Sequence, residues 1–206
     1  MYARSTTVRG DPQKIDDGIA YVRDDVMPKV QQMSGCVGLS MLCDRESGRC
    51  IVTTAWADEG AMHATEESTR PMRERARDVF GGEIEVNEWE IAVLHRMHEA
   101  PDGACTRVTW TRGDPGRIDR TIDTVRMALL PRLEELDGFC SVSVMVNRDN
   151  GMCSLATTYM SRESMMGTRE AVSKMRDEFT QQLNMDVTDM AEFDLTLAHL
   201  RVPETV

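Results

Sequence analysis

The chain has 206 residues, of which 41% are hydrophobic, so we expect a globular protein of one large domain or two smaller ones rather than a disordered chain. Its formal net charge of -11 argues against a nucleic-acid partner, because a phosphate backbone is bound by basic surfaces. The sequence shows neither an apolar signal segment nor a run long enough to span a membrane. We therefore expect a cytoplasmic protein without a membrane partner.

The tetrapeptide RGDP occurs twice, at residues 9–12 and 112–115, and this offset of 103 residues continues along the chain. Such a long match predicts one unit written twice, a tandem duplication. We assign residues 1–96 to the first repeat, 97–104 to a linker and 105–206 to the second repeat. The matched positions include Arg4 and Arg107, Ile15 and Ile118, Gly35 and Gly138, Met62 and Met165 and, after one inserted residue, His95 and His199.

Each repeat opens with a predicted strand, residues 2–8 or 105–111, that leads into RGDP. The aspartate of the tetrapeptide is placed to cap a helix, and the proline to occupy its first position. Because Arg-Gly-Asp is also a cell-adhesion tripeptide, a binding loop is the alternative interpretation. That role needs a secreted protein, a protruding loop and an aspartate that caps nothing, so we interpret the motif as a joint between strand and helix.

The next helix of the first repeat begins near Ile15 and carries apolar residues at steps of three and four. Pro28 and Pro131 interrupt the two helices at the same place and predict a kink in each. A hairpin follows, then a second helix that Asp58 or Ser161 caps, and a last strand, NEWEIAVLH or AEFDLTLAH. The predicted fold class is therefore α+β, with two ferredoxin-like βαββαβ repeats whose sheets each need a cover on the face that lacks helices.

Six cysteines are present, but neither a CxxC pair nor a Cys/His set at zinc spacing occurs, so no metal site is predicted. Cys43 and Cys50 can face each other across the first hairpin, whereas the second repeat has Val146 and Cys153 at these positions. The fold therefore does not require a disulfide there. We expect reduced, partly buried thiols that behave as small hydrophobic side chains.

The stretch TTAWADEGAMHATEES, which closes a predicted strand and opens a helix, resembles the antibiotic biosynthesis monooxygenase family. The family pattern is a strand-ending aromatic residue, a capping residue and an Ala-Met or Ala-Leu step. It is met by Trp56, Asp58, Ala61 and Met62, and in the second repeat by Tyr159, Ser161, Ser164 and Met165. The resemblance covers nearly the whole chain in pattern and implies a fused, intramolecular dimeric α+β barrel.

Members of that family include cofactor-independent oxygenases of aromatic polyketides, haem-degrading enzymes and proteins without an assigned reaction. A histidine commonly occurs where this chain has Thr65 and Thr168. The haem-degrading branch uses a histidine at the positions of Glu74 and Asp177, and a carboxylate replaces an imidazole poorly as a haem ligand. We therefore expect small-molecule chemistry without haem and without another cofactor.

In the usual ferredoxin-like strand order, the start of the first strand adjoins the ends of the third and fourth strands. An arginine, an aromatic ring and a histidine then meet at one end of each sheet. Arginine and the ring would bind an anionic or phenolic substrate, and histidine would act as the base that forms a substrate carbanion. The candidate residues are the substrate-binding Arg4, Trp56, Arg107 and Tyr159 and the catalytic His95 and His199.

A structural role is open for each of these residues. The histidines can cap a sheet or pair with an acid, the arginines can pair with Glu88, Glu90 or Asp194, and the aromatic rings can fill the core. Three functions are compatible with the chain: a cofactor-independent monooxygenase acting on an aromatic or polyketide-like substrate, a non-catalytic ligand-binding or sensor module, and a structural protein that assembles as a homo-oligomer. The family resemblance and the repeated arginine–aromatic–histidine set favour the first, which is our leading interpretation, whereas the missing family histidine and the methionine-rich helices favour the second as the alternative.

Overall fold

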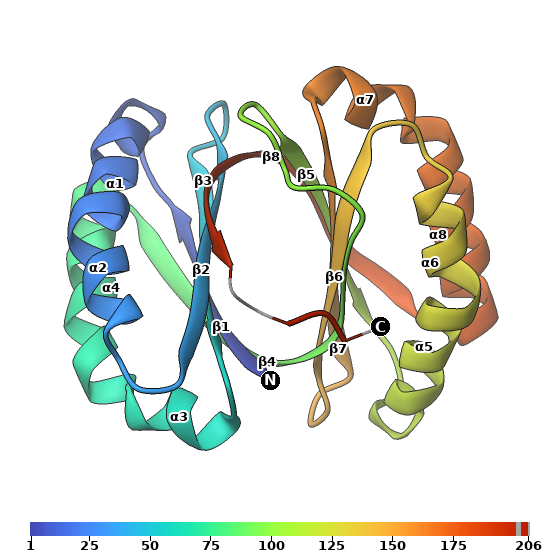
Figure 1. The fold of residues 1–206 in the computed structure, drawn as a ribbon, viewed down its shortest axis with the longest axis horizontal. Coiled ribbons are helices and arrows are strands. Elements are labelled where there is room, and N and C mark those ends of the chain that lie inside the picture. The colour runs from blue at the N-terminus through green and yellow to red at the C-terminus, as the bar shows by residue number, and fades with distance from the viewer. Residues whose placement is uncertain (201–202, 206) are drawn as a thin grey trace. The chain divides into compact units, whose positions relative to one another are not determined.

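The computed structural model describes residues 1–200 and 203–205, with the same order of elements in both halves of the chain (Figure 1). The first half contains β1 (Tyr2–Arg9), α1 (Ile15–Tyr21), α2 (Met27–Gln31), β2 (Cys36–Asp44), β3 (Arg49–Trp56), α3 (Glu59–Ala64), α4 (Glu66–Phe80) and β4 (Glu83–Arg96). The second half contains β5 (Cys105–Arg112), α5 (Ile118–Thr124), α6 (Leu130–Glu134), β6 (Phe139–Asn147), β7 (Met152–Tyr159), α7 (Arg162–Gly167), α8 (Arg169–Leu183) and β8 (Asp186–Leu200). Hydrogen bonding joins the strands in the order β1-β3-β2-β8-β5-β7-β6-β4 as a closed barrel, which confirms the predicted fold class of two ferredoxin-like repeats.

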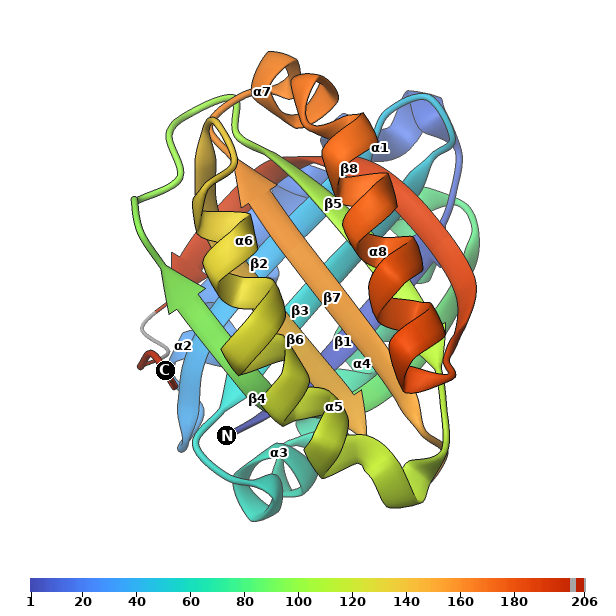
Figure 2. The same cartoon turned by 90° about the vertical axis from the view of Figure 1, so that its right-hand side faces the viewer.

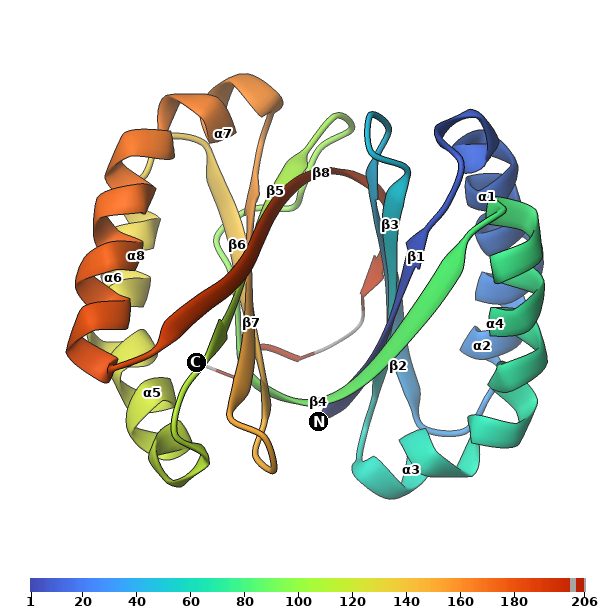
Figure 3. The same cartoon turned by 180° about the vertical axis from the view of Figure 1, so that it is seen from behind.

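In each half the helices cover one face of the sheet. Figure 3 shows α1, α2 and α4 against the sheet of β1, β2 and β3, and Figure 2 shows α5, α6 and α8 across β5, β6 and β7. From Ile15 to Val30, across α1 and α2, the predicted apolar stripe faces the core. Ile15, Val22 and Val30 are each 1% exposed. None of the helices that the structure describes is long and apolar enough to cross a membrane.

The last strand of each repeat is longer than the first. β4 and β8 have 14 and 15 residues, whereas β1 and β5 have 8 each. The end of β4, from Glu90 onward, pairs with β6 and belongs to the second compact unit of the chain. The end of β8, from Leu195, belongs to the first unit, where the Thr196 hydroxyl donates to the Met41 carbonyl at 3.1 Å. The two repeats therefore exchange strand ends.

Both RGDP stretches are joints of the kind that the sequence predicts. The carboxylate of Asp11 accepts a hydrogen bond from the Gln13 N–H at 2.9 Å, and a short 3-10 turn with proline at its start leads into the helix. The Gly10 N–H donates to the Gly48 carbonyl at 3.0 Å, and a Cβ on Gly48 would lie 2.2 Å from the Gly10 oxygen. The motif is thus packed against the neighbouring hairpin, with its aspartate engaged as a cap.

The first helix of each repeat widens next to its proline. Val22–Val26 and Val125–Leu129 are π-helical turns that end two residues before Pro28 and Pro131. A proline lacks the N–H that an α-helix needs, and its ring crowds the carbonyl four residues earlier. A π-helical turn relieves this crowding. The helices are therefore irregular at the predicted prolines, and each irregularity is a π-helical turn.

The second helix of each repeat is predicted to be continuous, but the structure divides it at Thr65 and Thr168. The hydroxyl of Thr65 donates to the Met62 carbonyl at 2.7 Å, and that of Thr168 donates to the Met165 carbonyl at 3.0 Å. These side-chain bonds satisfy carbonyls at the end of the short helix. The same two carbonyls also accept hydrogen bonds from the buried arginines of the candidate site.

Candidate functional site

Arg4 is a fully engaged side chain in the core of the first repeat. It lies on β1, is 3% exposed, and donates to Glu88 Oε1 from Nε at 3.0 Å and from Nη2 at 2.7 Å. Its Nη1 donates to Thr69 Oγ1 at 3.3 Å, and Nη2 also donates to the Met62 carbonyl at 3.1 Å. The alternative in which Arg4 pairs with Glu88 is therefore the one that the structure shows. Arg4 therefore links β1 and, through Glu88, β4 to the Met62 carbonyl at the break between α3 and α4.

Trp56 fills the core beside Arg4. Its side chain is completely buried at the end of β3, and its indole N–H donates to Thr54 Oγ1 at 3.1 Å. With the ring packed and its polar atom satisfied, Trp56 has the structural role that the sequence left open.

Arg107 repeats this arrangement in the second repeat, with one difference. It is 3% exposed and donates to Glu192 Oε1 from Nε at 3.0 Å and from Nη2 at 2.9 Å, and Nη2 reaches the Met165 carbonyl at 2.8 Å. The acid is Glu192 rather than the expected Asp194. Its Nη1 is buried and has no hydrogen-bond partner among the described residues, because Val172 stands where the first repeat has Thr69.

Tyr159 takes the place of Trp56 and is also completely buried. The guanidinium of Arg107 lies 5.8 Å from the centre of its ring, and the phenol oxygen makes no hydrogen bond of good geometry within the described residues. Burial raises the pKa of this phenol, although weak hydrogen bonds with Thr168 and Arg107 and the charge of Arg107 oppose the rise. Tyr159 is therefore a neutral, buried hydroxyl beside an arginine N–H that also lacks a partner.

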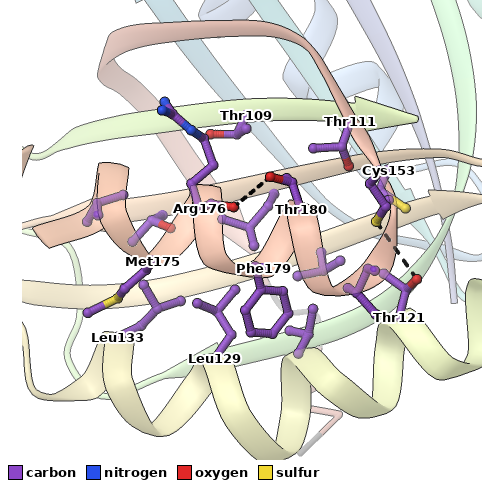
Figure 4. Close-up of a pocket in the computed structure, with 17 residues that line it drawn as sticks. Thr109, Thr111, Thr121, Leu129, Leu133, Cys153, Met175, Arg176, Phe179 and Thr180 are labelled. Atoms are coloured by element: carbon purple, nitrogen blue, oxygen red, sulfur yellow. Dashed lines mark hydrogen bonds between the residues drawn. The ribbon is translucent and has the colours of Figure 1, made fainter. Parts of the chain in front are cut away.

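A pocket of about 80 Å3 lies between the sheet and the helices of the second repeat (Figure 4). Thr109 and Thr111 of β5 and Cys153 and Thr157 of β7 form its sheet side. Its helix side is mostly apolar, with Leu129, Leu133, Val172, Met175, Phe179 and Leu183, and also includes Thr121, Arg176 and Thr180. Arg107 and Tyr159 follow Thr109 and Thr157 at two-residue steps toward one end of these strands, so they face the same helix layer.

In the first repeat, different side chains occupy the positions that correspond to the pocket residues. Arg73 is 12% exposed there, donates to Thr69 Oγ1 at 2.8 Å and pairs with Glu66. Its counterpart Arg176 instead contacts Ser173 and Asp177 of its own helix. The side chains of the second repeat are not all smaller than their counterparts in the first, because Phe179 stands where the first repeat has Ala76.

Phe80 is the second large difference. Its ring lies over Gly18, where an added Cβ would be 2.1 Å from Cε1. The second repeat has Leu183 and Thr121 at these positions, and both line the pocket.

His95 belongs to a different compact unit from Arg4 and Trp56. Because the end of β4 crosses to the second unit, His95 lies opposite Val142 of β6. Its Nε2 is 2.8 Å from Glu134 Oε1 and its Nδ1 is 3.2 Å from Glu204 Oε2, neither in the direction of a good hydrogen bond. His95 therefore lies next to two carboxylates, as the alternative interpretation allows, and its grouping with Arg4 and Trp56 stays a prediction.

His199 likewise belongs to a different compact unit from Arg107 and Tyr159. It is half-buried on the end of β8 that belongs to the first unit, while both other residues belong to the second. Neither histidine lines the pocket. The pocket residues are absent from the predicted site, although the sequence holds a signal for them: at the offset of 103, Thr69 becomes Val172 and Gly18 becomes Thr121.

The Glu192 carboxylate predicts how stability depends on pH. Burial alone would raise its pKa, but hydrogen bonds and charge from Arg107 and Arg169 lower the pKa below its ordinary value. A depressed folded-state pKa stabilises the fold above the unfolded value of about 4.3, and this contribution is lost as the pH falls through the folded-state pKa. We expect the free energy of urea unfolding to fall below about pH 4.3, and to fall less steeply in Glu192→Gln. The exposed Glu135→Gln is the control, and an unchanged slope in Glu192→Gln would contradict the assignment.

Solved structures share this fold over nearly the whole chain. A candidate monooxygenase of Lactobacillus acidophilus has a TM-score of 0.70 at 12% identity, covering 97% of this chain and 96% of its own. An anthrone oxidase-like protein has a TM-score of 0.69 at 12% identity, covering 97% and 93%. The heme-degrading enzyme LmHde of Listeria monocytogenes has a TM-score of 0.52 at 10% identity, covering 94% and 99%. The chain has the dimeric α+β barrel fold of the antibiotic biosynthesis monooxygenases, and at these identities the similarity establishes the fold alone.

Sequence comparison places the chain more narrowly. No family model matches it. It is 47% identical over 209 residues to the uncharacterized protein Rv2558 of Mycobacterium tuberculosis H37Rv, covering 100% of this chain and 88% of the relative. It is 45% identical over 206 residues to the uncharacterized protein Rv2557 of the same strain, covering 100% and 92%. The chain belongs to the family of these two mycobacterial proteins.

Proposed function

We propose that the protein is a non-catalytic ligand-binding module whose second repeat takes up a small, mostly apolar molecule with one oxygen atom. The observation that carries this proposal is the apolar pocket together with two buried polar atoms, Nη1 of Arg107 and the phenol oxygen of Tyr159, that lack partners in the described chain. An unpaired buried polar group costs about 1–3 kcal/mol. A ligand oxygen that pairs with one of these atoms would remove that cost.

The first repeat indicates where the free N–H of Arg107 points. In that repeat the matching Nη1 of Arg4 reaches Thr69, and the residue at the Thr69 position in the second repeat is Val172. Val172 lines the pocket. Arg107 and Tyr159 do not line the pocket themselves. We infer that the unpaired N–H of Arg107 points toward Val172, so that a ligand oxygen would have to reach it at the pocket end that Val172 forms.

The size of the pocket limits the ligand. Pockets for drug-sized molecules hold about 300–1,000 Å3, whereas a dry cavity of about 150 Å3 binds benzene. The present pocket has about 80 Å3. A polyketide does not fit it as it stands, and a single ring requires some movement of the walls. Met175 and Met185 are suited to such movement, because an unbranched thioether chain adapts its shape.

A cofactor-independent monooxygenase is the second candidate. The likeness to an anthrone oxidase-like protein favours it, and so does the contact of His95 with Glu134, since a histidine held by a carboxylate can serve as a base. Against it, the pocket wall contains neither histidine nor acid. Oxygen uptake with anthrone decides between the candidates: we expect none, and uptake that His95→Gln abolishes would replace our proposal with the oxygenase.

Binding of phenol and benzene tests the proposal, because the two rings differ by one hydroxyl. By calorimetry we expect phenol to bind about fivefold more tightly than benzene, as one hydrogen bond contributes about 1 kcal/mol. Val172→Thr places a hydroxyl beside Arg107 and should remove this preference, while its mirror variant Thr69→Val in the first repeat should keep it. Absence of binding for both rings, or a preference that Val172→Thr leaves intact, contradicts the proposal.

A further inference from the structure

The first repeat contains a pair of cysteines that the proposed ligand site does not use. Cys43 of β2 lies directly opposite Cys50 of β3 in the antiparallel ladder, next to the turn that joins the two strands. Both side chains are completely buried in the same hydrophobic cluster under the helices. Side chains directly opposite on one face of a sheet have Cβ atoms about 4.5–5.5 Å apart, and a disulfide requires about 3.5–4.5 Å, so a small approach of the two strands brings the sulfur atoms into bonding range.

We propose that Cys43 and Cys50 are an oxidation site at which a reversible cross-strand disulfide closes the first hairpin. In the structure both cysteines are thiols, and the contact between them is the main cause, with burial second, that raises the pKa of the Cys50 thiol. A raised pKa keeps the Cys50 thiol protonated and slow to react while the hairpin is closed. Reaction therefore follows a local opening of the hairpin at its exposed turn, residues 45–47.

The chemistry balances with a peroxide as the oxidant. One thiolate attacks a peroxide oxygen, the O–O bond breaks, and a sulfenic acid and one water form. The second thiol then attacks the sulfenic sulfur, the S–O bond breaks, a second water leaves and the S–S bond forms. The two thiols together lose two electrons and two protons, which hydrogen peroxide takes up as it becomes two waters. A thiol reductant reverses the step by exchange.

The second repeat shows that the cysteine pair is not needed for packing. At the corresponding positions Val146 lies opposite Cys153, with both side chains buried in the second core. Cys43→Val therefore gives the first hairpin a pair that this fold already accommodates. The Gly48 carbonyl, in the turn that the disulfide would close, accepts a hydrogen bond from the Gly10 N–H. The disulfide would therefore also hold the first RGDP stretch against the hairpin.

Counting thiols tests this site in the full chain. The reduced protein is treated with hydrogen peroxide, and a second sample is unfolded and refolded in a glutathione redox buffer, so that burial cannot block oxidation. After denaturation and alkylation, mass spectrometry should find four of the six cysteines alkylated in both samples. The peptides that contain Cys43 and Cys50 should be cross-linked. Cys43→Val should keep all five of its thiols.

Two results would overturn the proposal. One is that all six thiols survive refolding in the redox buffer. The other is that the cross-link joins different cysteines or persists in Cys43→Val. Recovery of all six thiols after dithiothreitol is expected, since reversibility distinguishes a disulfide from oxidation to sulfinic acid.

Discussion

Replacing Thr69 by valine is expected to lower the free energy of unfolding by about 2–3 kcal/mol. The Thr69 hydroxyl accepts hydrogen bonds from Arg4 at 3.3 Å and Arg73 at 2.8 Å, and it donates to the Thr65 carbonyl at 2.8 Å. Valine has almost the same shape, so little packing is lost. The cost comes from leaving two guanidinium N–H groups without an acceptor in a site where Arg4 is 3% exposed.

The mirror variant Val172→Thr provides the matched control. Its new hydroxyl can accept from the unpaired Nη1 of Arg107 and donate to the Thr168 carbonyl, so burial of the hydroxyl is compensated. We expect the free energy of unfolding to change by less than about 1 kcal/mol. Urea denaturation of both variants measures the difference. Equal losses in the two would show that Val172 does not face the N–H of Arg107.

Exchanging Gly18 for threonine is expected to be still more damaging, at about 3 kcal/mol, because it overpacks the first core. A Cβ at Gly18 would lie 2.1–2.6 Å from three atoms of the Phe80 ring, and that ring is completely buried. The second repeat carries threonine at the same position, as Thr121, without this conflict, because Leu183 stands where the first repeat has Phe80.

The double variant Gly18→Thr/Phe80→Leu copies the second repeat into the first. Leucine removes the ring that the threonine would strike, so part of the loss should return, with a coupling energy of about 1–3 kcal/mol between contacting residues. A double-mutant cycle by urea denaturation gives this coupling directly. Strictly additive losses would mean that the ring moves aside without cost and that the two positions are independent.

Much of the fold could be predicted from the sequence because local signals and the repeat agree. Asp11 and Asp58 are caps in the structure as the sequence indicates, and Gly35 adopts a left-handed φ of +79° in the turn between α2, which ends at Gln31, and β2. The exchange of strand ends could not be predicted in the same way. The alternation of NEWEIAVLH is the same whether its end pairs with one neighbour or another, so pattern alone placed His95 beside Arg4.

The candidate site was predicted less well than the fold, for a physical reason. The predicted site residues are those that match between the two repeats. Of these, Arg4 and Arg107 pair with Glu88 and Glu192 and also bond to the helix layer, so they hold each sheet to its helices. The pocket arises where the repeats differ, at Val172 and Thr121. Whether such differences open a space depends on packing in three dimensions, which residue types alone do not specify.

A crystal of the full chain pressurised with xenon tests the central claim most directly, because xenon enters apolar cavities without needing a polar partner. We predict a xenon atom between the sheet and helices of the second repeat, in contact with Leu129, Met175 and Phe179. In Thr121→Gly/Leu183→Phe, which gives the second repeat the ring packing of the first, the xenon occupancy there should fall. Xenon absent from this pocket, or bound equally at the level of Phe80 in the first repeat, would contradict the account.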